Sequence, residues 1–300
     1  MYDLAQRLLF IVNPHSGKGL IKNHLLEIVD IMIKAGYDVT VYLTQGQGDA
    51  KAKAANDGLT YDRIVCCGGD GTLDEVASGL IAAGVTVPLG YIPAGSTNDF
   101  ADSLQLPRRM LRAAQVAVQG YPFPCDMGCF NDSTFVYVAA FGLFTSASYL
   151  TPQEVKNVLG HVAYILEGAK DLLDIPSVHM TIEADGSRYE GDFMYGMITN
   201  SVSVGGFKGM TGPDVKLDDG LFEGTFIRNP RNALELNDIL ASLTKRTDES
   251  DMIYTFKTDQ VHIVSEKTAW TLDGEFGGEH EEVNIRVLRQ RIPILMGKQQ

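Results

Sequence analysis

Along the first third of the chain, short apolar runs alternate with longer stretches whose apolar residues recur at helical intervals. A continuous apolar run predicts a buried parallel strand, and a spacing of three or four residues predicts an amphipathic helix. Repeated strand–helix units of this length predict a parallel sheet with right-handed crossovers. The predicted strands are 8–12, 39–43, 63–67 and 88–92, and the predicted helices are 20–35, 49–56 and 72–83.

After Pro122 the pattern changes to short apolar runs separated by turn residues, which is typical of antiparallel strands in a β-sandwich. We therefore expect two domains, an α/β domain over residues 1–124 and a mainly antiparallel β-sandwich domain over residues 125–300. A last apolar run, 292–296, is compatible with a return to the first domain. The other predicted strands are 123–130, 134–141, 179–184, 193–199, 221–228, 260–264, 270–273 and 283–288, with helices at 153–173 and 232–243.

Composition limits the classes of partner. The 300 residues carry a formal net charge of −13 and are 45% hydrophobic, as expected of a soluble globular protein. Nucleic acid is disfavoured as a partner because phosphate backbones bind basic surfaces. No apolar stretch reaches the roughly 18 residues that a membrane-spanning helix needs. The N-terminus lacks the pattern of a signal peptide, so these features predict a cytoplasmic protein.

The glycine-rich turn after the third predicted strand, Gly68-Gly69-Asp70-Gly71-Thr72, is the most informative segment. Glycines allow a tight turn and the close approach of a ligand to the backbone. A helix beginning near Thr72 would offer N–H groups and a partial positive charge to a phosphate. Asp70 favours an accompanying metal ion, because a carboxylate alone would repel the phosphate. The segment is neither a Walker A loop nor a dinucleotide-binding fingerprint.

Local structure alone offers a second interpretation of this segment. Thr72-Leu73-Asp74-Glu75 fits a capping box, in which Thr72 is the N-cap of the helix and Glu75 reaches back to the Thr72 N–H group. The glycines would then serve the tight turn before the helix. A capping box and a phosphate site are compatible with each other.

Four further polar turns carry candidate chemistry, and each also has an ordinary structural interpretation. Residues 13–17 end a strand, and Asn98-Asp99 can cap a helix. Asp218-Asp219-Gly220 is typical of a turn, and Asp273-Gly274-Glu275 is typical of a hairpin. In a parallel sheet, ligands bind beyond the carboxyl ends of the strands. We therefore expect one edge of the sheet to carry the turns after Val12, Leu43, Cys67 and Ile92.

The chain resembles the catalytic domain of the diacylglycerol kinase family, especially its soluble bacterial lipid kinases, in five ordered segments. These segments are 13–17, 68–72, 93–99, 213–221 and 273–275. The Gly-Gly-Asp-Gly-Thr motif also occurs in NAD kinases, whereas the ordered set is specific. The resemblance extends from about residue 8 to residue 296. It implies an NAD-kinase-like first domain and a β-sandwich second domain, with ATP in the cleft between them.

The resemblance implies catalytic roles for three carboxylates. Glu275 matches the proposed general base of the family, and Asp70 belongs to the acidic network around the metal. A glyceride hydroxyl is poorly acidic, so a carboxylate within hydrogen-bond reach can accept its proton as the new bond forms. Asp273 lies next to Glu275 in the same motif and stays an alternative base.

The resemblance also implies an ATP site and a magnesium site. Mg²⁺ neutralises phosphate charge during phosphoryl transfer, and carboxylates are its natural ligands. The Asp219 carboxylate, with the main-chain oxygens of Lys216 and Leu221, matches the family's magnesium site, to which Asp70 and Asp99 would be linked through water. The implied nucleotide-binding residues are Asn13, Ser16, Thr44, Gly68, Gly69, Gly71, Thr72 and Ser96.

The activity implied by the resemblance is transfer of the γ-phosphate of ATP to the free hydroxyl of diacylglycerol, giving phosphatidic acid. Such a cytoplasmic enzyme would work as a peripheral protein at the inner face of the membrane, and the resemblance also points to a homodimer. The alternatives are a kinase for another lipid alcohol (phosphatidylglycerol, a sphingoid base, ceramide or a polyprenol), a NAD kinase, or a non-catalytic nucleotide- or lipid-binding homologue. Asp74 stands where the family often has Asn and leaves the nucleotide preference open.

Overall fold

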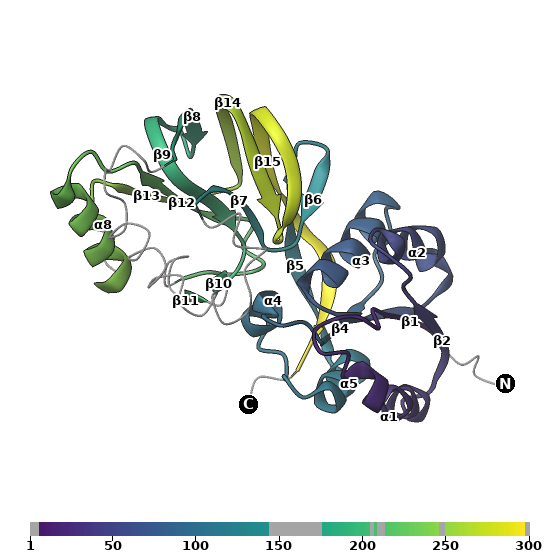
Figure 1. Cartoon of the computed structure of the whole chain (residues 1–300). Coiled ribbons are helices and arrows are strands. Elements are labelled where there is room, and N and C mark those ends of the chain that lie inside the picture. Colours follow the sequence, from purple (N-terminus) through teal and green to yellow (C-terminus); the bar gives the residue numbers. More distant parts are fainter. Residues whose placement is uncertain (1–5, 144–175, 205–206, 209–213, 246–249, 298–300) are drawn as a thin grey trace. The chain divides into compact units, whose positions relative to one another are not determined.

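The computed structural model describes residues 6–143, 176–204, 207–208, 214–245 and 250–297. The chain divides into two compact units (Figure 1), which we call unit 1 (Met1–Met127 and Arg289–Gln300) and unit 2 (Gly128–Leu288). Strands β5 (Tyr121–Phe130) and β15 (Glu275–Met296) carry the chain from one unit to the other. The end of the chain therefore belongs to unit 1. The predicted helix 153–173 lies outside the described residues.

Unit 1 is built on a parallel sheet with the strand order β4-β3-β1-β2. Every neighbouring pair in this order is parallel, which confirms the prediction from the alternating strand and helix pattern. The end of β15 extends the sheet beside β4, with Ile294 opposite Leu89. The four strands are β1 (Gln6–Val12), β2 (Tyr37–Leu43), β3 (Arg63–Gly68) and β4 (Leu89–Pro93).

Helices cover both faces of this sheet, with α1 and α5 on one face and α2 and α3 on the other (Figure 1). Residues 8–12 of β1 are consequently buried on both sides, which explains their continuous apolar run. The helices of unit 1 are α1 (Ile21–Lys34), α2 (Asp49–Asp57), α3 (Asp70–Ala82), α4 (Asp99–Ser103) and α5 (Met110–Gln119), and a short 3₁₀ helix spans Gly58–Thr60.

Unit 2 is antiparallel, as the sequence predicts. Strand β9 (Ser187–Thr199) pairs first with β8 (Val178–Ala184) and then with β7 (Val138–Gly142). Strand β14 (Gln260–Leu272) does the same in the same order. Strands β7 and β8 therefore occupy successive parts of one strand position between β9 and β14.

The remaining elements extend this sheet. Strand β12 pairs with β9 on the other side, β13 pairs with β12, and β15 pairs with β14. Fully buried aromatic side chains, among them Trp270, Phe141 and Phe226, form the core of unit 2. The remaining bounds are β6 (Ser133–Phe135), β10 (Ser203–Val204), β11 (Phe207–Lys208), β12 (Phe222–Arg228), α8 (Ala233–Lys245) and β13 (Ile253–Thr258).

The sequence pattern misplaces several strand ends in unit 2. The predicted strands 260–264 and 270–273 form one strand, β14. The polar residues between them do not form a turn; they lie where the pairing register of β14 with β15 shifts. Thr268 Oγ1 donates a hydrogen bond to the carbonyl oxygen of Glu266 at 2.7 Å in this irregular segment. A polar bulge of this kind has the same sequence pattern as a turn. The predicted strands 283–288 and 292–296 likewise form one strand, β15, and β13 was not predicted at all.

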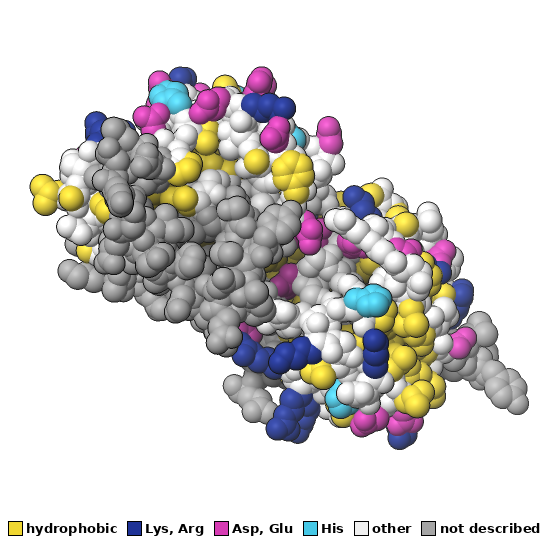
Figure 2. Space-filling view, viewed as in Figure 1, with side chains coloured by type: hydrophobic (Ala, Val, Ile, Leu, Met, Phe, Trp, Pro, Cys, Tyr) yellow, Lys and Arg dark blue, Asp and Glu magenta, His cyan; other side chains and the backbone are white. Residues whose placement is uncertain are grey.

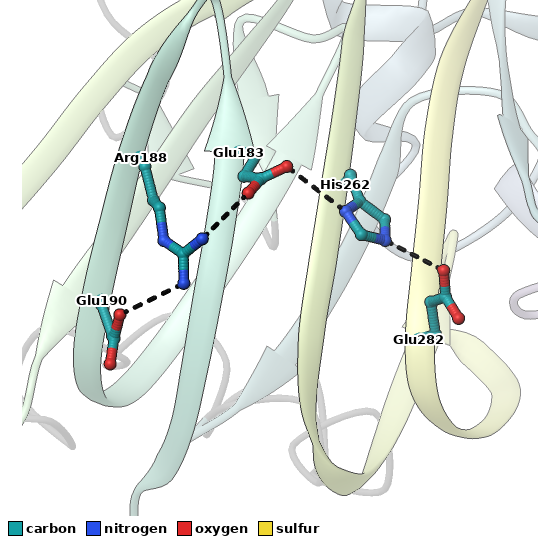
Figure 3. A network of polar contacts seen from close by, with 5 residues as sticks. All are labelled: Glu183, Arg188, Glu190, His262 and Glu282. Carbon is teal, nitrogen blue, oxygen red and sulfur yellow. Dashed lines mark hydrogen bonds and ion pairs between the residues drawn. The ribbon is translucent and has the colours of Figure 1, made fainter.

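Exposed polar side chains of β8, β9, β14 and β15 form a connected network (Figure 3). Glu183 lies 3.4 Å from Arg188 and 3.6 Å from His262, and His262 lies 3.0 Å from Glu282. Over this part of unit 2, charged side chains of both signs are interspersed on the surface (Figure 2). Exposed ion pairs of this kind contribute little to stability. Because these side chains are accessible to solvent, the network identifies the solvent face of the sheet.

The predicted capping box at the start of α3 does not form. Helix α3 begins at Asp70, before Thr72, so Thr72 is not its N-cap. The Glu75 carboxylate instead accepts the N–H groups of Gly48 at 2.8 Å and Ala50 at 3.1 Å. These N–H groups belong to the first turn of α2, where no intrahelical partner is available. Glu75 therefore caps the neighbouring helix rather than its own.

We predict that Glu75→Ala lowers the free energy of unfolding by about 1–2 kcal/mol, the usual cost of removing a helix cap. Urea unfolding followed by far-UV circular dichroism measures this change. The control is Asp30→Ala on α1, which removes an exposed ion pair with Lys34 and should change stability little. Equal stability of the two variants would contradict the capping role.

Candidate functional site

Two turns of unit 1 are joined at the carboxyl edge of its parallel sheet. The Gly69 N–H group donates to Ser16 Oγ at 2.9 Å, and Asn13 Nδ2 donates to Thr72 Oγ1 at 3.2 Å. Asn13 and Ser16 follow β1, whereas Gly69 and Thr72 follow β3. Because parallel strands end at the same edge, residues far apart in the sequence become neighbours here.

The turn after β4 lies directly against the turn after β3. A Cβ atom added to Gly95 would lie 2.6 Å from Cα of Gly69, and one added to Gly17 would lie 2.3 Å from the carbonyl oxygen of Ala94. A side chain at Gly95 would therefore push the turns after β3 and β4 apart, and one at Gly17 would push the turn after β1 away from the turn after β4. Asn98 holds the third turn in shape, since its side chain accepts the N–H of Gly95 at 2.8 Å and donates to the Gly95 carbonyl oxygen at 2.9 Å.

Two aspartates are buried next to each other at this edge. The Asp99 N–H group donates to Asp70 Oδ2 at 3.0 Å, and the two residues are only 3% and 9% exposed. The Tyr91 hydroxyl lies 3.5 Å from Asp70 Oδ1 and 3.3 Å from the carbonyl oxygen of Gly68. Asp70 is the first residue of α3, where the partial positive charge of the helix end favours a carboxylate.

The other predicted nucleotide-binding residues lie at the same edge. Thr44 follows β2, is buried, and donates its N–H group to the carbonyl oxygen of Val12 at 2.9 Å. Ser96 is exposed in the turn after β4, and Gly71 lies in the first turn of α3. The turns after β1, β2, β3 and β4 therefore bring Asn13, Ser16, Thr44, Gly68, Gly69, Asp70, Gly71, Thr72, Ser96 and Asp99 to one edge of the sheet.

Asp273 in unit 2 binds backbone amides. Its carboxylate accepts the N–H groups of Val136 at 2.6 Å, Tyr137 at 2.9 Å and Val138 at 2.9 Å, and the residue is only 5% exposed. These hydrogen bonds occupy the segment between β6 and β7. They explain why the predicted strand 134–141 is broken in two.

Glu275 has a different environment from Asp273, although both belong to one hairpin. Leu272 pairs with Glu275, and the two residues between them, Asp273 and Gly274, have φ angles of 51° and 86°. Positive φ at both central positions is characteristic of a tight two-residue hairpin, which confirms the structural interpretation of this motif. Glu275 itself is exposed, next to Phe276, which is 69% exposed.

The predicted metal-binding turn precedes β12 in unit 2. Asp219 is exposed, and its Oδ1 atom accepts the N–H of Leu221 at 3.0 Å. Lys257 Nζ donates to the carbonyl oxygen of Asp214 at 2.6 Å. Within the described ranges, no group of three or more His, Cys, Asp or Glu side chains is arranged to hold a metal ion. A cation at this turn would therefore need main-chain oxygens, such as those of Lys216 and Leu221, as well as Asp219.

A buried carboxylate, Glu223, lies close to this turn and was missed by the sequence analysis. Glu223 is 5% exposed, and Lys257 Nζ lies 3.2 Å from its Oε1 atom, although without hydrogen-bond geometry. Burial raises the pKa of Glu223 to about 7; Lys257 opposes this rise, and the negative charge of Asp219 adds to it. The signal for this site was an acidic residue near the start of β12, whose only other charged residue, Arg228, is its last.

Two further residues of the unit 1 site were not predicted as functional, Tyr91 and Asn98. Tyr91 lies in the apolar run of β4, where its hydroxyl group is invisible to a hydrophobic pattern. Asn98 has a φ angle of 55°, and Asn is one of the residues that tolerate this conformation. The sequence signal for Asn98 was therefore its position in a polar turn.

The fold and its polar edge define an α/β protein with a glycine-rich, acidic site. The model of the diacylglycerol kinase catalytic domain matches residues 7–130. The diacylglycerol kinase of Bacillus subtilis (strain 168) is 36% identical over 91% of this chain and 91% of the relative. That of Staphylococcus carnosus (strain TM300) is 35% identical over 98% of this chain and 96% of the relative. The chain therefore belongs to the diacylglycerol kinase family.

Solved structures share the fold. A diacylglycerol kinase from Bacillus anthracis strain Sterne superposes with a TM-score of 0.76 over 99% of this chain and 98% of that chain, at 23% identity. A second structure from the same strain superposes with a TM-score of 0.84 over 99% of both chains, at 24% identity. In the part of the chain that the structure describes, no helix is both long and apolar enough to cross a membrane.

We predict that Asp273→Asn destabilises unit 2 by roughly 2–4 kcal/mol, because an amide cannot accept all three backbone N–H groups. The only tryptophan, Trp270, lies in unit 2, so urea unfolding followed by its fluorescence reports on this unit. Glu275→Gln alters the exposed carboxylate of the same hairpin and should leave the midpoint nearly unchanged. If Asp273→Asn unfolded like the wild type, the structural role of Asp273 would be wrong.

Glu223 predicts a pH dependence of stability. Because burial raises its pKa from 4.5 to about 7, the folded state holds a proton that the unfolded chain has already released. The free energy of unfolding should therefore fall as the pH rises through this window and stay lowered above it. Glu223→Gln should lack this fall, which amounts to roughly 3 kcal/mol at about 1.4 kcal/mol per pKa unit. Urea unfolding in EDTA between about pH 5 and about pH 8 measures the difference. If the free energy of unfolding changed with pH in the same way in the wild type and in Glu223→Gln, the prediction would be refuted.

Proposed function

We propose that the protein transfers the γ-phosphate of ATP to the free hydroxyl of diacylglycerol and forms phosphatidic acid. The observation that carries this proposal is the set of hydrogen bonds that unites the turns after β1, β3 and β4 at one edge of the unit 1 sheet. Membership of the diacylglycerol kinase family supports the choice of reaction. Because diacylglycerol resides in membranes, the reaction would take place at a membrane surface.

Unit 1 is proposed to bind ATP. The phosphates would lie against Gly69 and the first turn of α3, since a helix N-terminus and a glycine turn together favour anions. The hydroxyl groups of Ser16 and Thr72 would help to position the phosphates. Both already join the turn after β1 to the turn after β3, through Gly69 and Asn13. Positioning of this kind supplies most of the catalysis in phosphoryl transfer, because little covalent help is needed.

Asp70 and Asp99 are proposed to act together with a magnesium ion. The Asp99 N–H group donates to the Asp70 carboxylate, so the two aspartates are neighbours at this edge, and carboxylate oxygen atoms are of the kind that Mg²⁺ prefers. The exposed carboxylate of Asp219, with the main-chain oxygens of Lys216 and Leu221, would form the magnesium site of unit 2. Bound Mg²⁺ would neutralise phosphate charge during transfer.

Glu275 is proposed to be the general base in preference to Asp273. The Asp273 carboxylate is buried and accepts three backbone N–H groups, which leaves it poorly placed to take a proton from a substrate. Glu275 is exposed, and so is the apolar Phe276 that follows it in the chain, a combination that suits a lipid alcohol. Asp273 would then hold the hairpin that carries the base.

The assay that tests the function uses purified protein, radiolabelled ATP and vesicles that contain one lipid alcohol at a time, with and without Mg²⁺. Label should appear in phosphatidic acid when diacylglycerol is present, and EDTA should abolish it. Faster labelling of phosphatidylglycerol, a sphingoid base, ceramide, a polyprenol or soluble NAD would replace diacylglycerol as the substrate. ATP binding without labelling of any acceptor would show a homologue without catalysis.

We predict that Glu275→Gln lowers kcat by about 10²–10⁴-fold, the usual contribution of a general base. ATP binding, measured by equilibrium dialysis, should persist because the amide keeps the shape of the side chain. The matched control is Glu281→Gln, which alters another exposed carboxylate of β15 and should retain full turnover. Wild-type turnover in Glu275→Gln would remove Glu275 from this role.

A further inference from the structure

The side chains of Glu223 and Lys257 join three segments of unit 2 at one point. Glu223 on β12 lies directly opposite Lys257 on β13 in the antiparallel register. Lys257 Nζ lies 3.2 Å from Glu223 Oε1 and donates a hydrogen bond to the carbonyl oxygen of Asp214 at 2.6 Å. One ammonium group therefore connects two strands of the sheet with the turn that precedes β12.

Glu223 gives Lys257 its fixed position. A buried carboxylate is costly unless a cation lies next to it, and Glu223 is 5% exposed. The Lys257 side chain supplies that positive charge and is more accessible to solvent, with a side-chain exposure of 40%. An exposed lysine ordinarily samples many rotamers. Here the ammonium group lies 3.2 Å from the buried Glu223 and donates a hydrogen bond to the Asp214 carbonyl oxygen, and the two contacts together limit its rotamers.

The turn is thus held at both ends. Lys257 binds the carbonyl oxygen of Asp214 at its start, and Asp219 Oδ1 accepts the N–H of Leu221 at its end. The proposed magnesium ligands lie on this stretch of chain, two of them main-chain oxygens. Main-chain ligands bind a cation tightly only when the backbone that carries them is already in place, because ordering it on binding costs free energy.

We propose that Lys257 is a positioning residue, which pre-arranges the turn 214–221 for a divalent cation through its hydrogen bond to Asp214. This inference rests on the proposed magnesium site at Asp219. Lys257 does not touch the cation; it fixes the backbone from which the ligands project. Partners that orient metal ligands in this way typically change metal affinity by about 10–100-fold when they are removed.

The test measures the affinity for Mg²⁺ through its effect on thermal unfolding, without lipid or ATP. Trp270 fluorescence gives the thermal unfolding midpoint of unit 2 as MgCl₂ is titrated, because a ligand that binds the folded state raises this midpoint. In the wild type, the midpoint should rise with Mg²⁺. Asp219→Ala should abolish the rise, and Lys257→Met should shift it to about tenfold or more higher Mg²⁺ concentration. Lys257→Arg, which keeps a donor and a positive charge, should restore most of the affinity.

Two further variants separate positioning from general stability. Lys267→Met removes an ammonium group that lies 2.9 Å from the Glu279 carboxylate elsewhere in the same unit. This variant should bind Mg²⁺ as the wild type does. The double variant Glu223→Leu, Lys257→Met replaces the pair with apolar side chains. Such replacements often preserve stability. This variant should therefore fold, lack the donor to Asp214, and show the same loss of Mg²⁺ affinity as Lys257→Met.

The possible failures are distinguishable. If Asp219→Ala keeps the wild-type response to Mg²⁺, the proposed magnesium site is wrong and the role of Lys257 is wrong with it. If Asp219→Ala loses the response while the double variant keeps wild-type affinity, the magnesium site stands and the positioning role of Lys257 is overturned. A loss of affinity in Lys267→Met equal to that in Lys257→Met would also overturn it.

Discussion

The close approach of two glycine turns sets the geometry of the polar edge in unit 1. A single Cβ atom at Gly95 would come within 2.6 Å of Cα of Gly69, so the turns after β3 and β4 can touch only as glycines. Their contact allows the Asp99 N–H group to reach the Asp70 carboxylate. The parallel pairing of β1 with β3 places the Ser16 hydroxyl at the Gly69 N–H group of the same turn. The proposed ATP site depends on this packing, because without it the side chains would belong to separate loops.

In two places of unit 2, a buried carboxylate lies close in the sequence to an exposed one. In the hairpin, Asp273 accepts three backbone N–H groups, and the next acidic residue, Glu275, is left exposed. Near β12, Glu223 is buried against Lys257, and Asp219 is exposed. In the hairpin, the buried Asp273 carboxylate itself holds backbone N–H groups. Near β12, it is Lys257, paired with the buried Glu223, that binds the backbone carbonyl oxygen of Asp214. Preorganisation of this kind is what phosphoryl transfer requires, because the reaction depends on positioning and charge more than on covalent catalysis.

Hydrophobic patterns predicted unit 1 better than unit 2, for a physical reason. The strands of a covered parallel sheet are apolar on both faces, and its helices are amphipathic, so both leave clear periods in the sequence. The antiparallel strands of unit 2 have a solvent face, and β14 also contains an irregular polar segment, so polar residues within one strand resemble a turn. The opposite error occurred at residues 134–141, where the distant Asp273 carboxylate takes the N–H groups that a continuous strand would use.

The amino-acid pattern alone specified the parallel sheet, the polar turns at the ends of its strands and the kinds of residue available for chemistry, since these follow from local spacing and residue type. The partners of those residues came from the folded chain. Glu75 caps α2, whose first N–H groups lie 25 and 27 residues away in the sequence, instead of its own helix. Glu223 and Lys257 meet across two strands, one of which the pattern did not predict. A carboxylate binds whichever donor the packing brings near it, and that proximity is a property of the tertiary structure.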